Sequence, residues 1–235
     1  MKTLFSVNEG LPTREAGGNV TQPAIRRRDK LAPDPGVRRA ILTAASKSVR
    51  EQGVRGFSVA AVLDRAQLST RAFYRHFDSK DELVAMVFLD MARVEMRRLR
   101  KKMAAAGTPV EAVAAWIDGR LDLAFDDDIK SDLRRLSMEA QSQMFASPEL
   151  IQPAYAQMLA PLVEQLQRGL DDGAFPGIDP ANDAQSIQGV VWACTERHWA
   201  TNDCERSDVR RTAFQFCLRG LGVAPDTITR LTQHD

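Results

Sequence analysis

A polar segment between residues 58 and 83 carries the side chains whose types and spacing best suit a chemical role. Six of them fall on one side of a short predicted helix and two more flank it: Ser69, Thr70, Arg71, Tyr74, Arg75 and His76, with Ser58 and Lys80. Hydroxyl, lysine and arginine groups donate hydrogen bonds to phosphate oxygens, and arginine also fits the two acceptors of a guanine edge. On the other side of the same helix are Ala72, Phe73 and Phe77. The pattern predicts a helix that packs through its apolar side and offers its polar side to a nucleic acid.

An ordinary amphipathic surface helix would show the same division of residues. In that alternative, Tyr74 and His76 pack against neighbours and Arg71 is solvated. The choice between the two interpretations depends on the elements that hold this helix in place.

Capping signals predict two short helices after a longer one. Asp34-Pro35 suits an N-cap followed by the first helical residue, and the helix that begins there is expected to end at Gly53. Ser58 and Ser69 are N-cap residues for two short helices, with a tight turn at Gln67-Leu68 between them. This order of elements is that of a helix-turn-helix.

A long helix is predicted to follow directly. Ser79 and Glu82 have the spacing of a capping box, and the helix is expected to run to about Gly107. Its inward positions are expected to be Leu83, Val87, Met91 and Val94.

The rest of the chain has helical periodicity as well. Breaks rich in proline, glycine or asparagine delimit predicted helices over residues 108–126, 129–146, 148–171, 180–201 and 205–221. Alternating β-branched runs and Asn-Gly hairpin signals are absent from the sequence. We therefore expect an all-α fold of about nine helices. Its predicted parts are a basic arm (1–34), a helix-turn-helix domain (35–82), a larger helical effector-binding and dimerisation domain (83–222) and a C-terminal tail (223–235).

The segment from Phe57 to Leu83 resembles the DNA-binding signature of the tetracycline-repressor (TetR) family. The family pattern Tyr-x-(His/Tyr)-Phe-x-(Ser/Asn)-Lys-x-x-Leu is matched throughout by Tyr74 to Leu83. The resemblance covers about residues 35–90. Three positions depart from the family pattern: Gln67 replaces a usual glycine, Leu63 a usual small alanine, and Ala60 a residue that is often polar. Because Gln67 stands in the turn, we expect a non-glycine residue with positive φ there, at some strain.

The resemblance implies roles for individual residues and for the whole protein. It implies that Ser58, Tyr74 and Lys80 contact phosphates and that Thr70, Arg71 and His76 face the groove. Ser69 and Arg75 are further candidates for contact with DNA. It also implies a homodimer that binds a palindromic operator in double-stranded DNA and represses transcription until a small-molecule effector releases it. The alternative is a DNA-binding regulator that has no small-molecule ligand and is either purely architectural or senses a partner.

Large apolar and aromatic side chains beyond residue 100 are candidates for the lining of an effector pocket. They are Met103, Trp116, Phe125, Met138, Met144, Phe145, Tyr155, Met158 and Trp192. Such side chains can line an adaptable pocket for an apolar or amphipathic effector, and the alternative is an ordinary core.

The last two predicted helices resemble, by their position, the pair through which the family dimerises. Their apolar stripes are Ile187, Val191, Cys194 and His198 on one helix and Phe214, Cys217, Leu218 and Leu221 on the other. Two such stripes and their symmetry mates suit a four-helix interface, and the alternative is that they belong to the core of one chain.

Cys194 and His198 raise an alternative from another functional class. At positions i and i+4 they suit a thiolate pair or two metal ligands. The other histidines, His76 and His234, lie far from them in the sequence, and the sequence has no phosphate-binding glycine loop and no nucleophile elbow. We therefore predict no catalytic residue, no metal site and no cofactor.

Charge is distributed unevenly along the chain. Residues 1–80 hold 15 lysines and arginines against 7 aspartates and glutamates, whereas residues 81–235 hold 17 against 24. A basic N-terminal part on an acidic body is expected to meet a polyanion with that first part. Arg26-Arg27-Arg28 is predicted either to follow DNA phosphates or to belong to a solvated tail.

The compartment expected from the sequence is the cytoplasm. No apolar run is long enough for a membrane span, and residues 1–10 lack the apolar region of a signal peptide. Three widely spaced cysteines suit free thiols in a reducing compartment.

Overall fold

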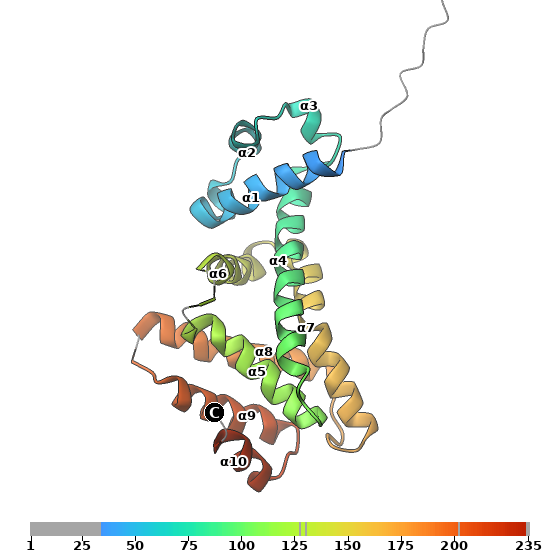
Figure 1. Cartoon of the computed structure of the whole chain (residues 1–235), viewed down its shortest axis with the longest axis vertical. Helices are drawn as coiled ribbons and strands as arrows, with labels where there is room; N and C mark the ends of the chain where they lie inside the picture. The colour runs from blue at the N-terminus through green and yellow to red at the C-terminus, as the bar shows by residue number, and fades with distance from the viewer. Residues whose placement is uncertain (1–33, 127, 130, 202, 234–235) are drawn as a thin grey trace, which may run out of the picture. The chain divides into compact units, whose positions relative to one another are not determined.

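Helices α1 to α10 and the turns between them make up the described part of the chain (Figure 1). The structure is a computed structural model, and it describes residues 34–126, 128–129, 131–201 and 203–233. The helices are α1 (Pro35–Gly56), α2 (Val59–Ala66), α3 (Thr70–Phe73), α4 (Lys80–Met103), α5 (Pro109–Phe125), α6 (Ser131–Ala146), α7 (Pro148–Asp171), α8 (Pro180–Thr201), α9 (Arg206–Gly220) and α10 (Pro225–Gln233). The predicted all-α class is confirmed for these residues.

The C-terminal tail is the one region where the expected number of helices was wrong. Residues predicted as a tail form α10, so the described residues hold ten helices and not nine. Pro225 opens α10, and Ile228 is buried against the core while Leu231 is half-buried. A nine-residue helix offers too few turns for its period to stand out in the sequence. The predicted basic arm lies outside the described residues, apart from Asp34.

Side-chain caps begin the helices around the polar segment. Asp34 Oδ1 accepts from Gly36 N at 2.8 Å, and Ser79 Oγ accepts from Glu82 N at 3.0 Å. The reciprocal bond of the predicted capping box is shifted by one residue, because Glu82 Oε2 accepts from Asp78 N and not from Ser79. Local hydrogen bonds therefore fix the starts of α1 and α4, the helices that precede and follow the polar segment.

Helix α4 connects the first three helices to the rest of the fold. It starts beside α1 and runs along α7, as Figure 1 shows. Leu83 and Val87 are buried as expected, but Val94 is 49% exposed. The inward position near that residue is taken by Glu95, a charged residue that an apolar pattern does not identify.

Glu95 is the centre of a buried ion-pair network between α4 and α5. Its carboxylate lies 2.7 Å from Arg120 Nη1 and 2.9 Å from Arg98 Nη2. Burial raises the pKa of Glu95, but the hydrogen bonds and charges of the two arginines outweigh burial and lower it overall. Breaking such a buried pair leaves an uncompensated charge, so the network holds α4 at a fixed position against α5.

Candidate nucleic-acid interface and ligand cavity

Helices α1, α2 and α3 pack around a small apolar cluster that holds the polar segment in place. Phe73 and Phe77 are each 1% exposed, and their rings stack at 5.7 Å between centroids. Val62 and Leu63 of α2 are buried in the same core. Regular α-helix in α3 covers only Thr70–Phe73, and hydrogen-bonded turns continue it to Phe77, whose N–H donates to Phe73 O. The short α3 is thus anchored by two phenylalanines.

The predicted DNA-contacting residues fall into two groups by exposure. Six are exposed, namely Ser58, Ser69, Thr70, Arg71, Tyr74 and Arg75. His76 and Lys80 are half-buried. Tyr74 is 64% exposed, and its ring makes an edge-to-face contact with the ring of Phe73. The Tyr74 side chain is therefore held by Phe73 and remains open to solvent.

Ser58 and Ser69 cap helices and remain able to bind a phosphate. Ser58 Oγ accepts from Ala61 N at 3.3 Å, and Ser69 Oγ accepts from Ala72 N at 3.2 Å. A hydroxyl that accepts in this way still has its own hydrogen to donate. Both side chains can therefore serve a cap and a phosphate oxygen at the same time.

His76 and Lys80 are partly engaged within the protein. Lys80 Nζ lies 5.5 Å from the centre of the Phe57 ring. His76 Nδ1 is buried and has no hydrogen-bond partner among the described residues. The flexible side chain of Lys80 can extend toward solvent, whereas the shorter side chain of His76 is half-buried.

The turn between α2 and α3 has the strained conformation expected from its sequence. Gln67 has φ 55° and ψ 43°, and it is the one non-glycine residue with positive φ in the described part of the chain. Its side-chain Nε2 donates to Asp64 O at 2.9 Å, and Leu68 N donates to Leu63 O at 2.9 Å. These bonds close the turn in the absence of the glycine that usually occupies such a position.

Helix α6 contacts the C-terminal part of α1 through two polar interactions. Arg50 Nε lies 3.1 Å from Asp132 Oδ1, and Glu139 Oε1 accepts from Val54 N at 2.8 Å. The second contact needs Gly53, which has φ 68° and whose missing side chain would stand 3.2 Å from Glu139 Oε2. Gly53 thus breaks α1 where the sequence indicated. It also lets Glu139 bind the backbone N–H of Val54, which is 85 positions before Glu139 in the chain.

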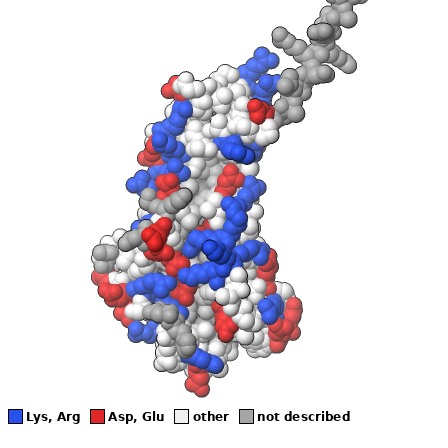
Figure 2. Space-filling model, viewed as in Figure 1, with Lys and Arg blue, Asp and Glu red and all other residues white. Residues whose placement is uncertain are grey.

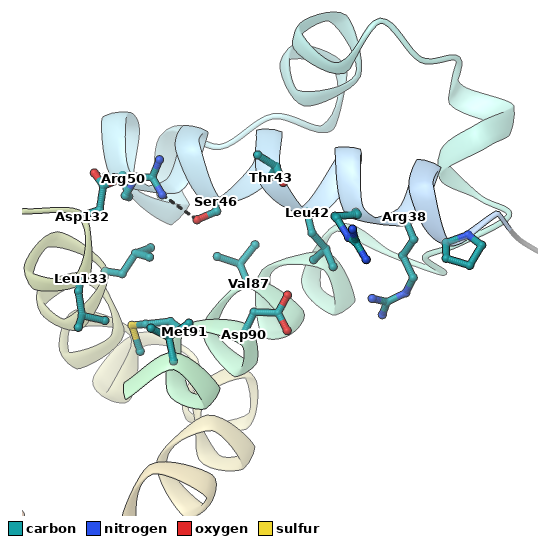
Figure 3. A pocket seen from close by; sticks show the side chains of 14 residues that line it. Arg38, Leu42, Thr43, Ser46, Arg50, Val87, Asp90, Met91, Asp132 and Leu133 are labelled. Atoms are coloured by element: carbon teal, nitrogen blue, oxygen red, sulfur yellow. Dashed lines mark hydrogen bonds and ion pairs between the residues drawn. The ribbon is translucent and has the colours of Figure 1, made fainter. Parts of the chain in front are cut away.

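A groove of about 670 Å³ separates α1, α4 and α6 beside these contacts. Figure 3 shows Leu42, Val87 and Met91 pointing into it, with charged side chains along its rim. Of the charged lining residues, Arg50 pairs with Asp132, and Asp90 pairs with Arg93, which lies on α4 outside the lining. None of the residues predicted for an effector pocket lines this groove.

A second, smaller cavity of about 280 Å³ lies between α6, α7 and α8. Of the predicted pocket residues, Met144, Tyr155 and Trp192 line it. Met103, Trp116 and Met158 are buried in the core, and Phe125 packs on His198 with 4.0 Å between ring centroids. Met138 and Phe145 are 47% and 88% exposed and contact neither cavity, because they lie on the outer side of α6.

Most of the predicted dimer residues are already buried within the single chain. Ile187, Val191, Phe214, Cys217, Leu218 and Leu221 are each less than 5% exposed. In the single chain these six residues pack on their own core, whereas Cys194 and His198 of the same stripe are half-buried. The exposed apolar side chain on α9 is Phe216, at 68%. A period of 3.6 residues identifies an apolar stripe but not whether another chain or the same chain covers it.

Cys194 and His198 do not form a reactive pair in this structure. Burial raises the pKa of the Cys194 thiol, and the nearby Cys204 raises it further. Burial also raises the pKa of Cys217 to about 12. The thiolate that a nucleophile or metal ligand requires is thus disfavoured at both positions. Within the described residues, no group of three His, Cys, Asp or Glu side chains has the arrangement of a metal site.

Glutamines of the small cavity were missed by the sequence interpretation. Gln141, Gln152, Gln185 and Gln188 all line it. Apolar and aromatic residues were the criterion for a pocket, and glutamine is more often an exposed residue. The spacing of Gln185, Gln188 and Trp192 places them on one side of a helix, but the sequence alone does not distinguish such a side from a solvated one.

Basic side chains accompany the predicted DNA-contacting residues on the surface. In the view of Figure 2, lysine and arginine side chains are found over the first helices and the middle of the face, and acidic side chains become more frequent over the lower helices. No helix in the described ranges is both long and apolar enough to cross a membrane.

Three kinds of comparison relate the chain to known proteins. Residues 41–87 match the model of the bacterial regulatory proteins of the tetR family. The transcriptional regulator BetI of Brucella melitensis is 25% identical over 177 residues, which cover 67% of this chain and 89% of BetI.

Solved structures with a similar fold include two that were determined with a bound molecule. RolR in complex with resorcinol has a TM-score of 0.62 at 18% identity, over 85% of this chain and 94% of RolR. FadR of Bacillus subtilis in complex with stearoyl-CoA has a TM-score of 0.59 at 19% identity, over 78% of this chain and 96% of FadR. At such identities the similarity concerns the fold.

Proposed function

Because this chain belongs to the TetR family of DNA-binding transcriptional regulators, we propose that it is a homodimeric repressor released from a palindromic operator by a small molecule. It is a regulator and not an enzyme. The cytoplasm, where operator DNA is accessible, is the proposed site of action.

One observation carries the DNA-binding part of the proposal. Phe73 and Phe77 anchor the polar segment from within, while Thr70, Arg71 and Tyr74 of the same segment are exposed. A major groove admits one helix, and the exposed hydroxyl, guanidinium and phenol groups are those that bind phosphates and base edges. Arg71 is proposed to read a base, while Ser58, Ser69 and Lys80 hold the phosphates on either side.

A dimer would bring two such segments to successive major grooves of one duplex. The two must then lie about 34–36 Å apart, or one helical turn of DNA. The predicted stripes on α8 and α9 face inward, so we assign the interface to the exposed sides of these helices, with Phe216 as its apolar anchor. Aromatic residues are enriched at the centres of protein interfaces, which supports Phe216 as the anchor.

Effector release requires that a molecule bind one arrangement of the chain better than another. The small cavity is the proposed site, and α6 is the proposed connection. Gln141 and Met144 of α6 line the cavity, and Glu139 and Asp132 of the same helix hold α1. A ligand that displaces α6 therefore acts on the first DNA-binding helix. RolR and FadR, which share the fold, were solved with resorcinol and with stearoyl-CoA, which supports a small-molecule effector over a protein partner.

Selection of genomic fragments by the purified full-length protein tests this function. We expect enrichment of one palindrome, one dimer per site, and an affinity that falls steeply with salt because phosphate contacts release counterions. Recovery of fragments without a shared motif, or binding of a single chain per site, would contradict the proposal.

A further inference from the structure

The small cavity is lined by uncharged polar and aromatic side chains. Its polar and aromatic residues are Gln141, Gln152, Gln185, Gln188, Tyr155 and Trp192, and no charged side chain among the described residues lines it. A charge carried into such a cavity loses its hydration and finds no opposite charge among the lining residues. The lining therefore disfavours a charged ligand of either sign.

Gln188 shows that hydrogen-bonding capacity is left unused at this cavity. The residue is 5% exposed, and neither its Oε1 nor its Nε2 has a hydrogen-bond partner among the described residues. A buried amide without partners is unfavourable, and buried polar groups are almost always paired. Because Gln188 lines the cavity, a molecule in the cavity can supply both a donor and an acceptor to it.

Neighbouring side chains define the rest of the site. The Tyr155 hydroxyl donates to Gln141 Oε1, which leaves the amide hydrogens of Gln141 free to donate. Burial raises the pKa of Tyr155, so the hydroxyl keeps its proton. Trp192, Met144 and Leu159 supply apolar surface against which a ring can lie.

We infer that the cavity binds an uncharged, ring-containing molecule whose polar edge both donates and accepts a hydrogen bond, such as an amide or a phenol, and that Gln188 pairs with this edge. That this molecule is the effector rests on the proposed function, whereas its binding does not. The sequence alone allowed an apolar or amphipathic effector, but an amphipathic molecule with a charged end does not fit this lining. A volume of about 280 Å³ suits a ligand of one or two rings.

A matched set of probes tests the chemical class without DNA. Benzamide, benzoate, benzylammonium and ethylbenzene have similar size and differ in the charge and polarity of one substituent. Calorimetric titration of the full-length protein at pH 7 is expected to show saturable binding of benzamide, at least tenfold tighter than that of benzoate and benzylammonium. Equal or tighter binding of either charged probe, or no saturable binding of benzamide, would overturn the inference.

Two variants assign the preference to Gln188. Gln188→Leu removes an unpaired amide and is expected to keep or raise the midpoint of thermal unfolding. It should also weaken the binding of benzamide at least fivefold and strengthen the binding of ethylbenzene. Gln167→Leu, at an exposed position of α7 outside the lining, should change both affinities less than twofold. A Gln188→Leu protein that still prefers benzamide, or that is clearly less stable, would show that the amide has a structural role instead.

Measurement on DNA separates this inference from the proposed function. If the probe that binds also lowers affinity for the selected operator, both stand. If it binds without any effect on DNA, the cavity assignment stands and its role as the effector site is wrong. Failure to bind DNA at all would leave the binding results unaffected.

Discussion

Glu139 of α6 accepts a hydrogen bond from the backbone N–H of Val54 at 2.8 Å, and Val54 lies near the end of α1. The same helix contributes Gln141 to the small cavity. Two residues of α6, only two positions apart in the chain, thus contact α1 and line the small cavity. This relationship gives the proposed effector a short physical connection to the operator.

Glu139→Ala removes the acceptor and is expected to loosen the end of α1. A part-buried N–H left without its charged partner should lower the free energy of unfolding by about 1–3 kcal/mol. It should also speed hydrogen exchange of the Val54 amide. Glu139→Gln keeps an acceptor oxygen at the same place and serves as the control, with exchange close to that of the native protein. Equal exchange in all three proteins would show that the bond does not hold α1.

Gln67→Gly is expected to stabilise the protein by roughly 0.5–1 kcal/mol. Glycine adopts positive φ without steric strain, and this gain exceeds the larger unfolded-state entropy of glycine. Gln67→Ala keeps the strained φ and loses the bond to Asp64 O, so it should destabilise. Chemical denaturation of the two variants measures the difference. A Gly variant less stable than the native protein would mean that the Gln67 side-chain bond to Asp64 O outweighs the strain of the positive φ.

Phe216→Glu is expected to disrupt the proposed dimer. The ring is 68% exposed in the single chain, so the substitution leaves the core intact while placing a charge in the interface. Sedimentation should shift from dimer toward monomer, and operator affinity should fall together with it. Gln215→Glu, the adjacent exposed residue, is the control for charge alone. A Phe216→Glu protein that sediments as the native dimer would place the interface elsewhere.

Glu95→Gln should destabilise the protein by about 3–5 kcal/mol at pH 7, because it leaves the buried Arg120 without its charged partner. The arginines hold the folded-state pKa of Glu95 below its ordinary value. The stabilisation is therefore complete above the unfolded pKa of about 4.3 and is lost as pH falls through the lower folded value.

Denaturation at several pH values tests this sign. The difference in the free energy of unfolding between the native and Glu95→Gln proteins should be constant above about pH 5 and should shrink in more acidic solution. Glu164→Gln removes an exposed partner of Arg100 and should cost less than about 1 kcal/mol at any pH. A difference in the free energy of unfolding that widens on acidification would contradict a lowered pKa of Glu95.

Local signals explain why much of the fold could be predicted from the sequence. Proline and capping residues determine where helices begin, so α7 and α8 have the bounds expected of them. Gln67 could be assigned positive φ because the turn requires it, and the structure confirms this. The helix α10 was missed because a short helix owes its stability to packing on α9, which the sequence does not display.

The candidate sites depend on tertiary contacts and were less predictable. An apolar stripe such as Phe214 and Leu218 looks the same whether its own core or a partner covers it. Buried polar residues carry no apolar signal, so Gln188 and Glu95 could not be recognised. Glu139 reaches Val54 only because the fold brings α6 beside α1. What the sequence did indicate was the exposed polar segment, whose residues are close together in the chain.

The most direct test of the account is the affinity of Arg71→Ala and Lys80→Ala proteins for the selected operator and for an unrelated duplex, at several salt concentrations. Arg71→Ala should lose about 1–3 kcal/mol of binding free energy on the operator and little on the unrelated duplex. Lys80→Ala should weaken binding to both duplexes alike. It should also lower the slope of log affinity against log salt concentration by about one. Arg168→Ala, an exposed arginine of α7, should change neither. If Arg71→Ala and Lys80→Ala both bind the operator as the native protein does, the polar segment is not the DNA-reading surface and the central claim is wrong.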